Sequence, residues 1–468
     1  MFDTIIIGGG PAGYMAAERL GHSKKKVLLI EEHQLGGTCL NAGCIPTKTL
    51  LNSVKLYVHA KEMEKFGVKV QRVTYDWNAI QNWKTEVVTK LRGGIEGKMK
   101  RFGVETINGR GEIIAPPSGE KPAVVKSVSH DGQTSEYKGK TVLVCAGSVP
   151  LIPPIPGAKD NPFASDSSVL LATENLPKWL TIIGGGVIGI EFAGLFSALG
   201  CQVTVIELMD EIIPFMDKEH SPVLRRSLRD VNFKLGCKVE KIDGADVFFT
   251  TKEKKLEKRE ADLVLVAAGR RPVTDTWGAK TAGIDTSVKG VAVDDRMRTN
   301  IPRIWAAGDV TGKSLLAHSA YRMGEVASSD ILQTLNPGEK NYHVTQDRMR
   351  YNAIPWAVYG ITEAAGVGIT EQEAAVKGIE IIKANLPMKL SGRFAAENTF
   401  SGTGAVKVIA DAFNRRILGI HAVGAYAPEF IWGGAALIEQ EFRIDEVKQL
   451  IFPHPTVSEL IRDVVWEM

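Results

Sequence analysis

The stretch Thr4-Ile5-Ile6-Ile7-Gly8-Gly9-Gly10-Pro11-Ala12-Gly13 decides the fold of this chain. Its short apolar strand runs directly into a glycine-rich turn, and the helical pattern of Tyr14 to Leu20 follows. In such a turn Gly8 permits the tight bend, Gly10 lets the backbone approach a pyrophosphate, and Gly13 lets helix and strand pack closely. The order of strand, turn and helix therefore predicts a phosphate-binding turn.

A second strand, Lys26 to Ile30, ends at the acidic residue Glu31. A carboxylate at this place can accept a hydrogen bond from an adenosine ribose hydroxyl. A glycine pattern alone is weak evidence, but this one comes with its strands, its helix and its acid. Residues 4–31 are thus predicted to form a complete dinucleotide-binding motif.

The same motif recurs in the middle of the chain, at Thr181-Ile182-Ile183-Gly184-Gly185-Gly186-Val187-Ile188-Gly189. A helix over Ile190 to Leu199 and a strand over Gln202 to Ile206 follow, and the strand ends at Glu207. The first glycine and the acid are 23 residues apart in both copies. This repetition predicts two dinucleotide sites. The alternative is a degenerate duplicate retained for packing.

Glu207 indicates which nicotinamide nucleotide the second motif takes. The 2′-phosphate of NADP would lie beside this carboxylate, and the next residues, Leu208, Met209 and Asp210, include no arginine to neutralise it. Like charges about 4 Å apart repel by between ~1 and ~4 kcal/mol, depending on the effective dielectric constant. The second motif is therefore predicted to bind NAD(H).

Two cysteines lie just after the first motif, in the stretch Gly36-Gly37-Thr38-Cys39-Leu40-Asn41-Ala42-Gly43-Cys44-Ile45-Pro46-Thr47-Lys48. Cys39 and Cys44 are five positions apart, so a single helical turn nearly brings their sulfurs together. The small residues Ala42 and Gly43 leave the backbone free to adjust for an S–S bond. The pair could therefore alternate between dithiol and disulfide.

Other interpretations of the cysteine pair are a structural disulfide, a metal site and two inert buried thiols. A structural disulfide is disfavoured because the chain shows no secretory segment. A metal site lacks the third and fourth ligands that usually lie nearby. Inert thiols fit the bare spacing as well as a redox pair does.

The composition is that of an ordinary globular protein, with 44% hydrophobic and 24% charged residues. The 468 residues predict about three domains, and a net charge of +3 argues against nucleic acid as a partner. Five cysteines are too few for a disulfide framework, and their odd number indicates a reducing compartment. With no targeting segment and no apolar run long enough to span a membrane, we expect a cytoplasmic protein.

The segment around Cys39 and Cys44 closely resembles the redox-active disulfide segment of the class I pyridine nucleotide-disulfide oxidoreductases. Within that family, its Cys-Leu-Asn-x-Gly-Cys pattern is nearest to the dihydrolipoamide dehydrogenases. The resemblance extends over essentially the whole chain. It implies an α/β fold with two Rossmann-like dinucleotide-binding domains and an α+β C-terminal dimerisation domain. It also implies FAD in the first motif, the nicotinamide nucleotide in the second, and a homodimer.

The resemblance and the sequence pattern together divide the chain into four segments. They are a first part of the FAD-binding domain (1–150), an NAD-binding domain (151–275), a second part of the FAD-binding domain (276–340) and an interface domain (341–468). Prolines at 150–156 mark the crossover into the NAD-binding domain. Helices are expected over 50–63, 428–442 and 444–450, and strands over 407–410 and 417–423.

The resemblance implies further cofactor contacts. Asp309, at the end of an apolar strand, is expected to accept hydrogen bonds from the ribityl chain of FAD; the alternative is an aspartate in a surface turn. Ala317 lies where a helix begins, and the positive end of that helix would stabilise a reduced, anionic flavin. Lys48 resembles the family lysine near flavin N5, and Glu191 resembles the acid that pairs with it. The alternative for Lys48 is a solvated surface lysine.

The segment Phe452-Pro453-His454-Pro455-Thr456-Val457-Ser458-Glu459 holds the predicted proton acceptor. A histidine between two prolines is rigidly presented, and Glu459 could orient the imidazole and stabilise its cation. Taken alone, His454 would be an ordinary loop histidine. Its match to the family's His-Pro-Thr-x-Ser-Glu segment implies a catalytic base contributed by the opposite subunit, with His318 and His343 as weaker candidates.

The resemblance implies oxidation of dihydrolipoyl groups to lipoyl with reduction of NAD⁺, through a Cys39–Cys44 disulfide. The implied partners are lipoyl-bearing carrier proteins of 2-oxoacid dehydrogenase or glycine cleavage complexes. One rival is another NAD(P)H-dependent disulfide reductase of the same architecture, acting on glutathione or on a metal ion. A second rival is a flavoprotein that serves only as a scaffold subunit. Residues 463–468 carry no extra cysteine pair, and Glu207 disfavours NADPH, so both features argue against the first rival.

Overall fold

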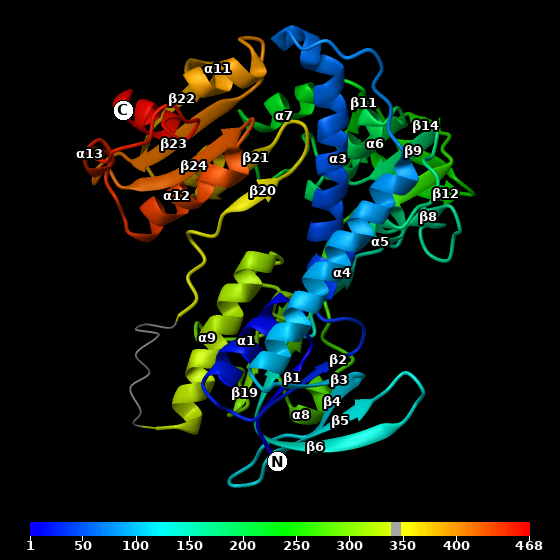
Figure 1. Ribbon diagram of the computed structural model, residues 1–468, viewed down its shortest axis with the longest axis vertical. Coiled ribbons are helices and arrows are strands. Elements are labelled where there is room, and N and C mark those ends of the chain that lie inside the picture. The colour runs from blue at the N-terminus through cyan, green and yellow to red at the C-terminus, as the bar shows by residue number, and fades with distance from the viewer. Residues whose placement is uncertain (338–347) are drawn as a thin grey trace. The chain divides into compact units, whose positions relative to one another are not determined.

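The computed structural model describes residues 1–337 and 348–468, and the chain forms two compact units (Figure 1). The first unit comprises Met1–Thr49, Gln81–Leu151 and Gly269–Arg350. The second unit comprises Leu50–Ile80, Ile152–Ala268 and Tyr351–Met468. The division into four segments stays a prediction, and its last boundary, together with His343, lies outside the described residues.

The first unit is built on a sheet of strand order β3-β2-β1-β6-β5-β4, and β19 pairs with β6. β1 (Phe2–Ile7) lies between β2 (Val27–Glu31) and β6 (Thr134–Val144) and runs parallel to both. Most residues of β1 and β2 are buried, which explains their nearly continuous apolar sequence. The other strands of this unit are β3 (Glu105–Asn108), β4 (Arg110–Ala115), β5 (Ala123–Val128), β7 (Ser148–Pro150), β16 (Arg270–Pro272), β17 (Thr286–Ser287), β18 (Gly290–Val291) and β19 (Ile304–Ala306).

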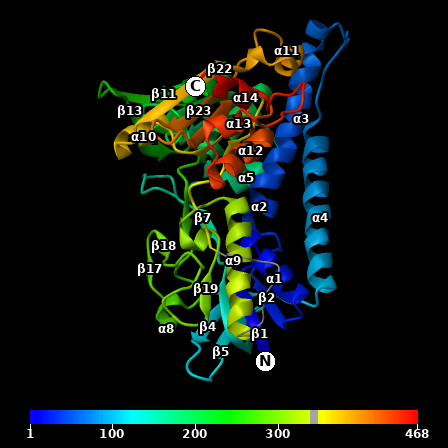
Figure 2. The ribbon, with the colours of Figure 1, turned by 90° about the vertical axis from the view of Figure 1, so that its left-hand side faces the viewer.

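Helices α1 (Pro11–His22) and α9 (Ala317–Leu335) pack side by side in the first unit (Figure 2). A Cβ atom at Gly324 of α9 would lie 2.4 Å from the carbonyl oxygen of Ala12, so glycine is required for this close approach. The other helical segments of the unit are α2 (Gly37–Ala42), α8 (Ala279–Ala282) and the 3-10 turn η2 (Asp309–Thr311). The chain passes from one unit to the other within α3 (Cys44–Glu62) and within α4 (Trp77–Arg101).

The second unit contains a parallel sheet of strand order β11-β10-β9-β15-β8. Here β9 (Trp179–Ile183), α6 (Val187–Ala198) and β10 (Gln202–Glu207) follow one another as β1, α1 and β2 do in the first unit. The other elements of this part are η1 (Met63–Phe66), β8 (Ala164–Ser165), α5 (Ser167–Leu171), α7 (Ser221–Ser227), β11 (Val231–Leu235), β12 (Lys238–Asp243), β13 (Asp246–Thr250), β14 (Leu256–Arg259) and β15 (Leu263–Val266).

The carboxyl-terminal part of the second unit is an antiparallel sheet of strand order β20-β21-β24-β23-β22. α12 (Ala427–Glu439) packs on β21 and β24, and α14 (Leu460–Trp466) packs on β22 and β23. The other bounds are β20 (Trp356–Val358), β21 (Ala364–Gly368), α10 (Glu371–Lys377), β22 (Ile381–Pro387), η3 (Met388–Leu390), α11 (Gly392–Asn398), β23 (Ala405–Asp411), β24 (Ile417–Val423) and α13 (Ile444–Val447). The predicted class, two dinucleotide-binding folds followed by an α+β part, is confirmed.

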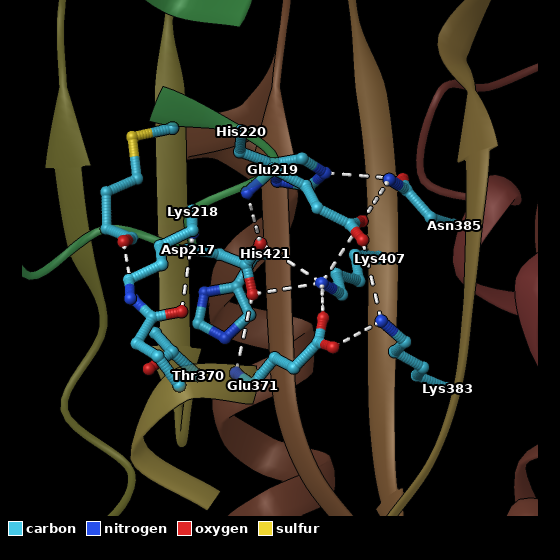
Figure 3. Close-up of polar contacts among 12 residues, drawn as sticks. Asp217, Lys218, Glu219, His220, Thr370, Glu371, Lys383, Asn385, Lys407 and His421 are labelled. Carbon is cyan, nitrogen blue, oxygen red and sulfur yellow. Dashed lines mark hydrogen bonds and ion pairs between the residues drawn. The ribbon is translucent and has the colours of Figure 1, made fainter. Parts of the chain in front are cut away.

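A buried polar cluster lies in the second unit around Lys407 of β23 (Figure 3). Lys407 Nζ lies 3.1 Å from both carboxylate oxygens of Asp217, 2.6 Å from Glu371 Oε2 and 3.2 Å from Glu219 Oε2. Burial alone would lower the pKa of Lys407, but hydrogen bonds to Glu371 and Asp217 outweigh burial and raise it. The ammonium group therefore stays charged in the interior.

His220, at the edge of this cluster, should make the protein sensitive to acid. Its ring is fully buried, Nε2 lies 3.2 Å from Asn385 Oδ1, and burial lowers its pKa to about 4. The unfolded chain protonates this ring near pH 6.5, so between pH 6.5 and 4 the unfolded state binds more protons. The free energy of unfolding should therefore fall on acidification across this window, by about 3 kcal/mol at most from this group.

Chemical denaturation of the holoenzyme at several pH values measures this loss. The His220→Gln variant should lose less stability than the wild type between pH 6.5 and 4, because it has no imidazole to protonate. An identical slope in both proteins would contradict the assignment.

Candidate active site

The first glycine turn has the open shape that a dinucleotide needs. Gly8 has φ +100°, and a Cβ atom there would lie 2.2 Å from the carbonyl oxygen of Cys145. A Cβ atom at Gly13 would lie 1.8 Å from the Gly8 oxygen, whereas one at Gly10 would have only Gly37 Cα near it, at 3.8 Å. No side chain caps the start of α1 at Gly10, so its first N–H groups are available to a pyrophosphate. The residues present fit the phosphates of FAD.

The second turn repeats this geometry. Gly184 has φ +110°, and a Cβ atom there would lie 2.5 Å from the Ala267 oxygen. A Cβ atom at Gly189 would lie 2.0 Å from the Gly184 oxygen, and one at Gly186 would meet nothing within 4 Å. The start of α6 at Gly186 also has no side-chain cap. Both turns are therefore complete, which argues against a degenerate second copy.

In both motifs, the acid at the end of the second strand also accepts a hydrogen bond from the glycine turn of the same motif. Glu31 accepts hydrogen bonds from the N–H groups of Gly9 at 2.6 Å and His33 at 2.8 Å. Glu207 accepts from Gly185 at 2.5 Å and Met209 at 2.7 Å. A carboxylate oxygen has two lone pairs, so capacity for a ribose hydroxyl remains. The sequence pattern predicted the ribose contact but not these hydrogen bonds between each acid and its glycine turn.

The structure brings the two predicted redox cysteines together. Cys39 lies in α2, Cys44 is the first residue of α3, and their side chains are hydrogen-bonded to each other. Gly43 joins the two helices, and a Cβ atom there would lie 3.0 Å from the Thr38 oxygen, so only a small residue allows this approach. No disulfide joins the two sulfurs in this structure.

The two thiols are electrostatically unequal. The hydrogen bond to Cys44 and then burial raise the pKa of Cys39 strongly, so Cys39 holds its proton. Cys44 begins a helix of 19 residues, where the helix dipole favours a thiolate. This asymmetry fits a pair in which Cys44 carries the negative charge.

Lys48 and Glu191 are found in different units. Lys48 is in the second turn of α3 within the first unit, and its charge acts on Cys39 to lower that pKa. Glu191 is buried in α6 of the second unit and accepts a hydrogen bond from the N–H of Tyr359 at 3.0 Å. The pairing of Lys48 with Glu191 stays a prediction.

Asp309 is part of a polar chain that the sequence did not indicate. Ser148 Oγ donates to Asp309 Oδ2 at 2.6 Å, and Arg270 Nε donates to Ser148 Oγ at 2.8 Å. Burial raises the pKa of Asp309 in spite of these neighbours. A partly buried carboxylate that accepts a hydrogen bond from Ser148 is suited to accept hydrogen bonds from a polyol chain as well, and its contact with FAD stays a prediction.

Two tyrosines that sequence analysis missed lie near the cysteine pair. Tyr14 Oη donates to Tyr321 Oη at 2.6 Å, which links α1 to α9 one turn after Ala317. Burial raises the pKa of both hydroxyls, and Cys39 acts electrostatically on both. Ala317 itself is the first residue of α9, whose N-cap Leu316 makes no side-chain cap, so the helix start is available to a ligand.

His454 and Glu459 form the predicted pair in the second unit. His454 Nδ1 lies 3.0 Å from Glu459 Oε2. The histidine side chain is 77% exposed, whereas the glutamate side chain is 5% exposed. A buried carboxylate thus orients an imidazole whose other nitrogen faces outward, as a base presented to a second subunit requires. Of the two weaker candidates for the catalytic base, His318 lies in the first turn of α9.

A family model described as pyridine nucleotide-disulphide oxidoreductase matches residues 2–324, and the dimerisation domain of the same family matches residues 354–465. The chain belongs to this family. Proteins named dihydrolipoyl dehydrogenase are among its relatives: that of Chlamydia pneumoniae is 35% identical, covering 98% of this chain and 95% of the relative. The dihydrolipoamide dehydrogenase of Chaetomium thermophilum is 36% identical, with 98% and 90% covered.

Two solved structures are similar over the whole chain. LpdA from Mycobacterium tuberculosis has a TM-score of 0.88 at 26% identity, with 100% of this chain and 99% of that chain covered. The HOCl-induced flavoprotein disulfide reductase RclA from Escherichia coli, as its Cu(II) complex, has a TM-score of 0.85 at 28% identity, with the same coverage.

Family membership confirms the predicted cofactors, FAD and NAD(H), which dihydrolipoyl dehydrogenases use. The dimerisation domain supports the predicted homodimer. Across residues 1–337 and 348–468, no helix is long and apolar enough to cross a membrane.

Proposed function

We propose that this protein is a dihydrolipoyl dehydrogenase, which oxidises dihydrolipoyl groups to lipoyl and reduces NAD⁺ through the Cys39–Cys44 pair. The observation that carries the proposal is the hydrogen-bonded pair of Cys39 in α2 and Cys44 at the start of α3, in a chain with two open dinucleotide turns. Full-length similarity to proteins named dihydrolipoyl dehydrogenase supports the same activity.

In the proposed reaction, His454 of one subunit takes a proton from the substrate dithiol, and Glu459 stabilises the imidazolium. The substrate thiolate attacks Cys39 Sγ, breaks the Cys39–Cys44 disulfide and releases Cys44 as a thiolate. The second substrate sulfur then attacks the first, which closes the lipoyl disulfide and releases Cys39. Two electrons now reside on the cysteines, and the two substrate protons end on Cys39 and His454.

FAD, when bound, supplies the relay that carries both electrons to NAD⁺. Six residues of the first unit would hold FAD: Gly8, Gly10, Gly13, Glu31, Asp309 and Ala317. Four residues of the second unit would hold NAD(H): Gly184, Gly186, Gly189 and Glu207. Lys48, with Glu191 as its partner, would balance negative charge at the cofactor.

The physiological partners that we propose are lipoyl-bearing carrier proteins of 2-oxoacid dehydrogenase or glycine cleavage complexes. The exposed imidazole of His454 supports access by a group tethered to another protein. We also propose the cytoplasm as the compartment, because the five cysteines of the chain are an odd and sparse set, which is typical of a reducing environment.

A substrate assay tests the proposal directly. Purified protein with free dihydrolipoamide and NAD⁺ should form NADH, and reduced glutathione in place of dihydrolipoamide should not. A yellow protein without turnover would favour the scaffold alternative, and turnover of glutathione alone would favour a glutathione-type reductase.

Preference for NAD(H) over NADP(H) is a second expected result. Glu207 is buried at the end of β10, so a 2′-phosphate beside it would meet a poorly solvated like charge. Repulsion of ~1 to ~4 kcal/mol corresponds to roughly 5-fold to nearly 1,000-fold lower affinity for NADPH than for NADH. The ratio of kcat/KM for the two nucleotides measures this effect, and comparable values would contradict the role of Glu207.

A further inference from the structure

Lys407 is a charged side chain with no exposed surface, in β23, an interior strand of the carboxyl-terminal sheet. A lysine ammonium has three donors, and three carboxylates receive them: Asp217, Glu371 and Glu219 (Figure 3). A buried ion pair can often be replaced by apolar side chains without loss of stability. Stability alone therefore does not explain why a lysine occupies this position.

Asp217 belongs to a segment that leads directly from the second dinucleotide motif. We call residues 208–217, which follow Glu207 at the end of β10, the post-β10 segment. At its start, Met209 donates its N–H to Glu207 Oε1 at 2.7 Å. In its middle, Ile213 donates its N–H to the carbonyl oxygen of Gly185 at 2.9 Å. The segment therefore holds both the acid and the central glycine of the second turn.

Ile213 adopts an unusual backbone conformation where it meets this turn. Its φ is +45°, a left-handed conformation that is unfavourable for a β-branched residue. Such a conformation persists only where the surroundings impose it. The segment must therefore be fixed on both sides of Ile213.

The fixed point on the far side is the cluster around Lys407. Both oxygens of Asp217 accept from Lys407 Nζ, and the N–H of Glu371 donates to Asp217 Oδ2 at 3.4 Å. Gln372 Nε2 donates to the Met216 oxygen at 2.8 Å. Apolar packing contributes too, because Ile212, Ile213 and Met216 are buried in one cluster with Ile190 of α6. The post-β10 segment is thus held by polar contacts to the Lys407 cluster and by apolar packing. Loss of the polar contacts should weaken its conformation rather than abolish it.

We propose that Lys407 is a positioning residue for the nicotinamide dinucleotide: through Asp217 it holds the post-β10 segment in the strained conformation that supports Gly185 and Glu207. The inference rests on the proposed function only in assigning NAD(H) to the second turn. Lys407 itself touches no reacting group. Its removal should change nucleotide affinity and leave the reaction of the cysteine pair with its substrate unchanged.

The test uses the full-length holoenzyme and two variants. Lys407→Met removes the cation at similar length, and Asp217→Asn removes one charge while keeping an oxygen acceptor. The second variant serves if the first fails to fold. Isothermal titration of the oxidised holoenzyme with NAD⁺ should give a Kd about 5- to 30-fold above that of the wild type, the factor expected when one strained backbone residue is released. Reduction of the bound flavin by dihydrolipoamide, without NAD⁺, should stay within about two-fold.

Asp330→Asn is the matched control. Asp330 is also buried and accepts hydrogen bonds from Arg298 at 2.5 and 2.7 Å; it belongs to the first unit, whereas the second turn belongs to the second unit. The Asp330→Asn variant should lose stability and keep the wild-type Kd for NAD⁺. An unchanged Kd in folded Lys407→Met or Asp217→Asn, or an equal rise in Asp330→Asn, would overturn the proposal.

The same titration distinguishes failure of this inference from failure of the proposed function. Wild-type protein that binds no NAD⁺ would overturn both. NAD⁺ binding that depends on Lys407, in a protein that does not oxidise dihydrolipoamide, would uphold the positioning role and reject only the proposed substrate.

Discussion

The Cys44→Ser variant is expected to keep its bound flavin and to lose dihydrolipoamide oxidation by roughly four orders of magnitude or more. Cys44 begins α3 and its side chain is hydrogen-bonded to Cys39, so a serine can preserve the local structure. It cannot form the disulfide that accepts the substrate's electrons. NADH formation from dihydrolipoamide and NAD⁺ measures the loss, and the visible absorption spectrum reports the flavin.

Cys201→Ala is the control for this experiment. Cys201 is a buried thiol of the second unit, outside both glycine turns. Burial raises its pKa to about 11, so it is not expected to react. This variant should turn over like the wild type. Substantial dihydrolipoamide oxidation by Cys44→Ser would refute the proposed route.

The His454→Gln variant should lower kcat/KM for dihydrolipoamide by roughly 10²- to 10⁴-fold, the usual contribution of a general base. His454 is exposed and held at 3.0 Å by the buried carboxylate of Glu459, so glutamine preserves size but cannot take the proton. Reduction of ferricyanide by NADH should be little affected, because that reaction removes no proton from a thiol. The comparison therefore separates proton transfer from electron transfer.

His130→Gln provides the matched control, because His130 is an exposed histidine in the loop between β5 and β6. It should behave like the wild type in both assays. The kcat/KM of Glu459→Gln for dihydrolipoamide should lie between those of His454→Gln and His130→Gln, because this variant keeps the base but removes its charged partner. If kcat/KM for dihydrolipoamide falls only a few-fold in His454→Gln, a group other than His454 takes the proton from the substrate.

The two dinucleotide motifs could be predicted because every residue that they need lies within one short stretch of chain. Helix α3 shows a first limit. It was expected over 50–63 but begins at Cys44, since Pro46 is tolerated in a first helical turn. The 25-residue helix α4 was not expected at all. Its glycines at 93, 94 and 97 have low helix propensity, and a Cβ atom at any of these positions would meet no other atom within 4 Å.

The carboxyl-terminal strands show a second limit. Strand β23 was expected over 407–410 and spans Ala405–Asp411, so it begins two residues earlier and ends one residue later than expected. Lys407 is in fact fully buried, since carboxylates from distant parts of the second unit neutralise it. Helix α12 ends at Glu439 rather than 442, and α13 is shorter than the expected 444–450.

Within the site, the unpredicted residues are those brought in by long-range contacts. Ser148 and Asp309 are 161 positions apart, and Tyr14 and Tyr321 are 307 positions apart. No local pattern links such residues, whereas Cys39, Cys44 and the His454–Glu459 pair each lie within a few positions of each other. Short motifs that resemble those of the family therefore predicted the candidate reactive groups, whereas the residues that orient them could be found only from the fold.

The central claim is that the two sulfurs relay electrons between an external dithiol and NAD⁺. Differential alkylation tests it most directly: the oxidised protein is treated with NADH without oxygen, and newly alkylated cysteines are identified by mass spectrometry. We predict that Cys39 and Cys44 both become alkylated, while the labelling of Cys145, Cys201 and Cys237 does not change. Two results would contradict the account. One is reduction of the flavin while Cys39 and Cys44 stay joined in a disulfide, and the other is alkylation of both cysteines before NADH is added.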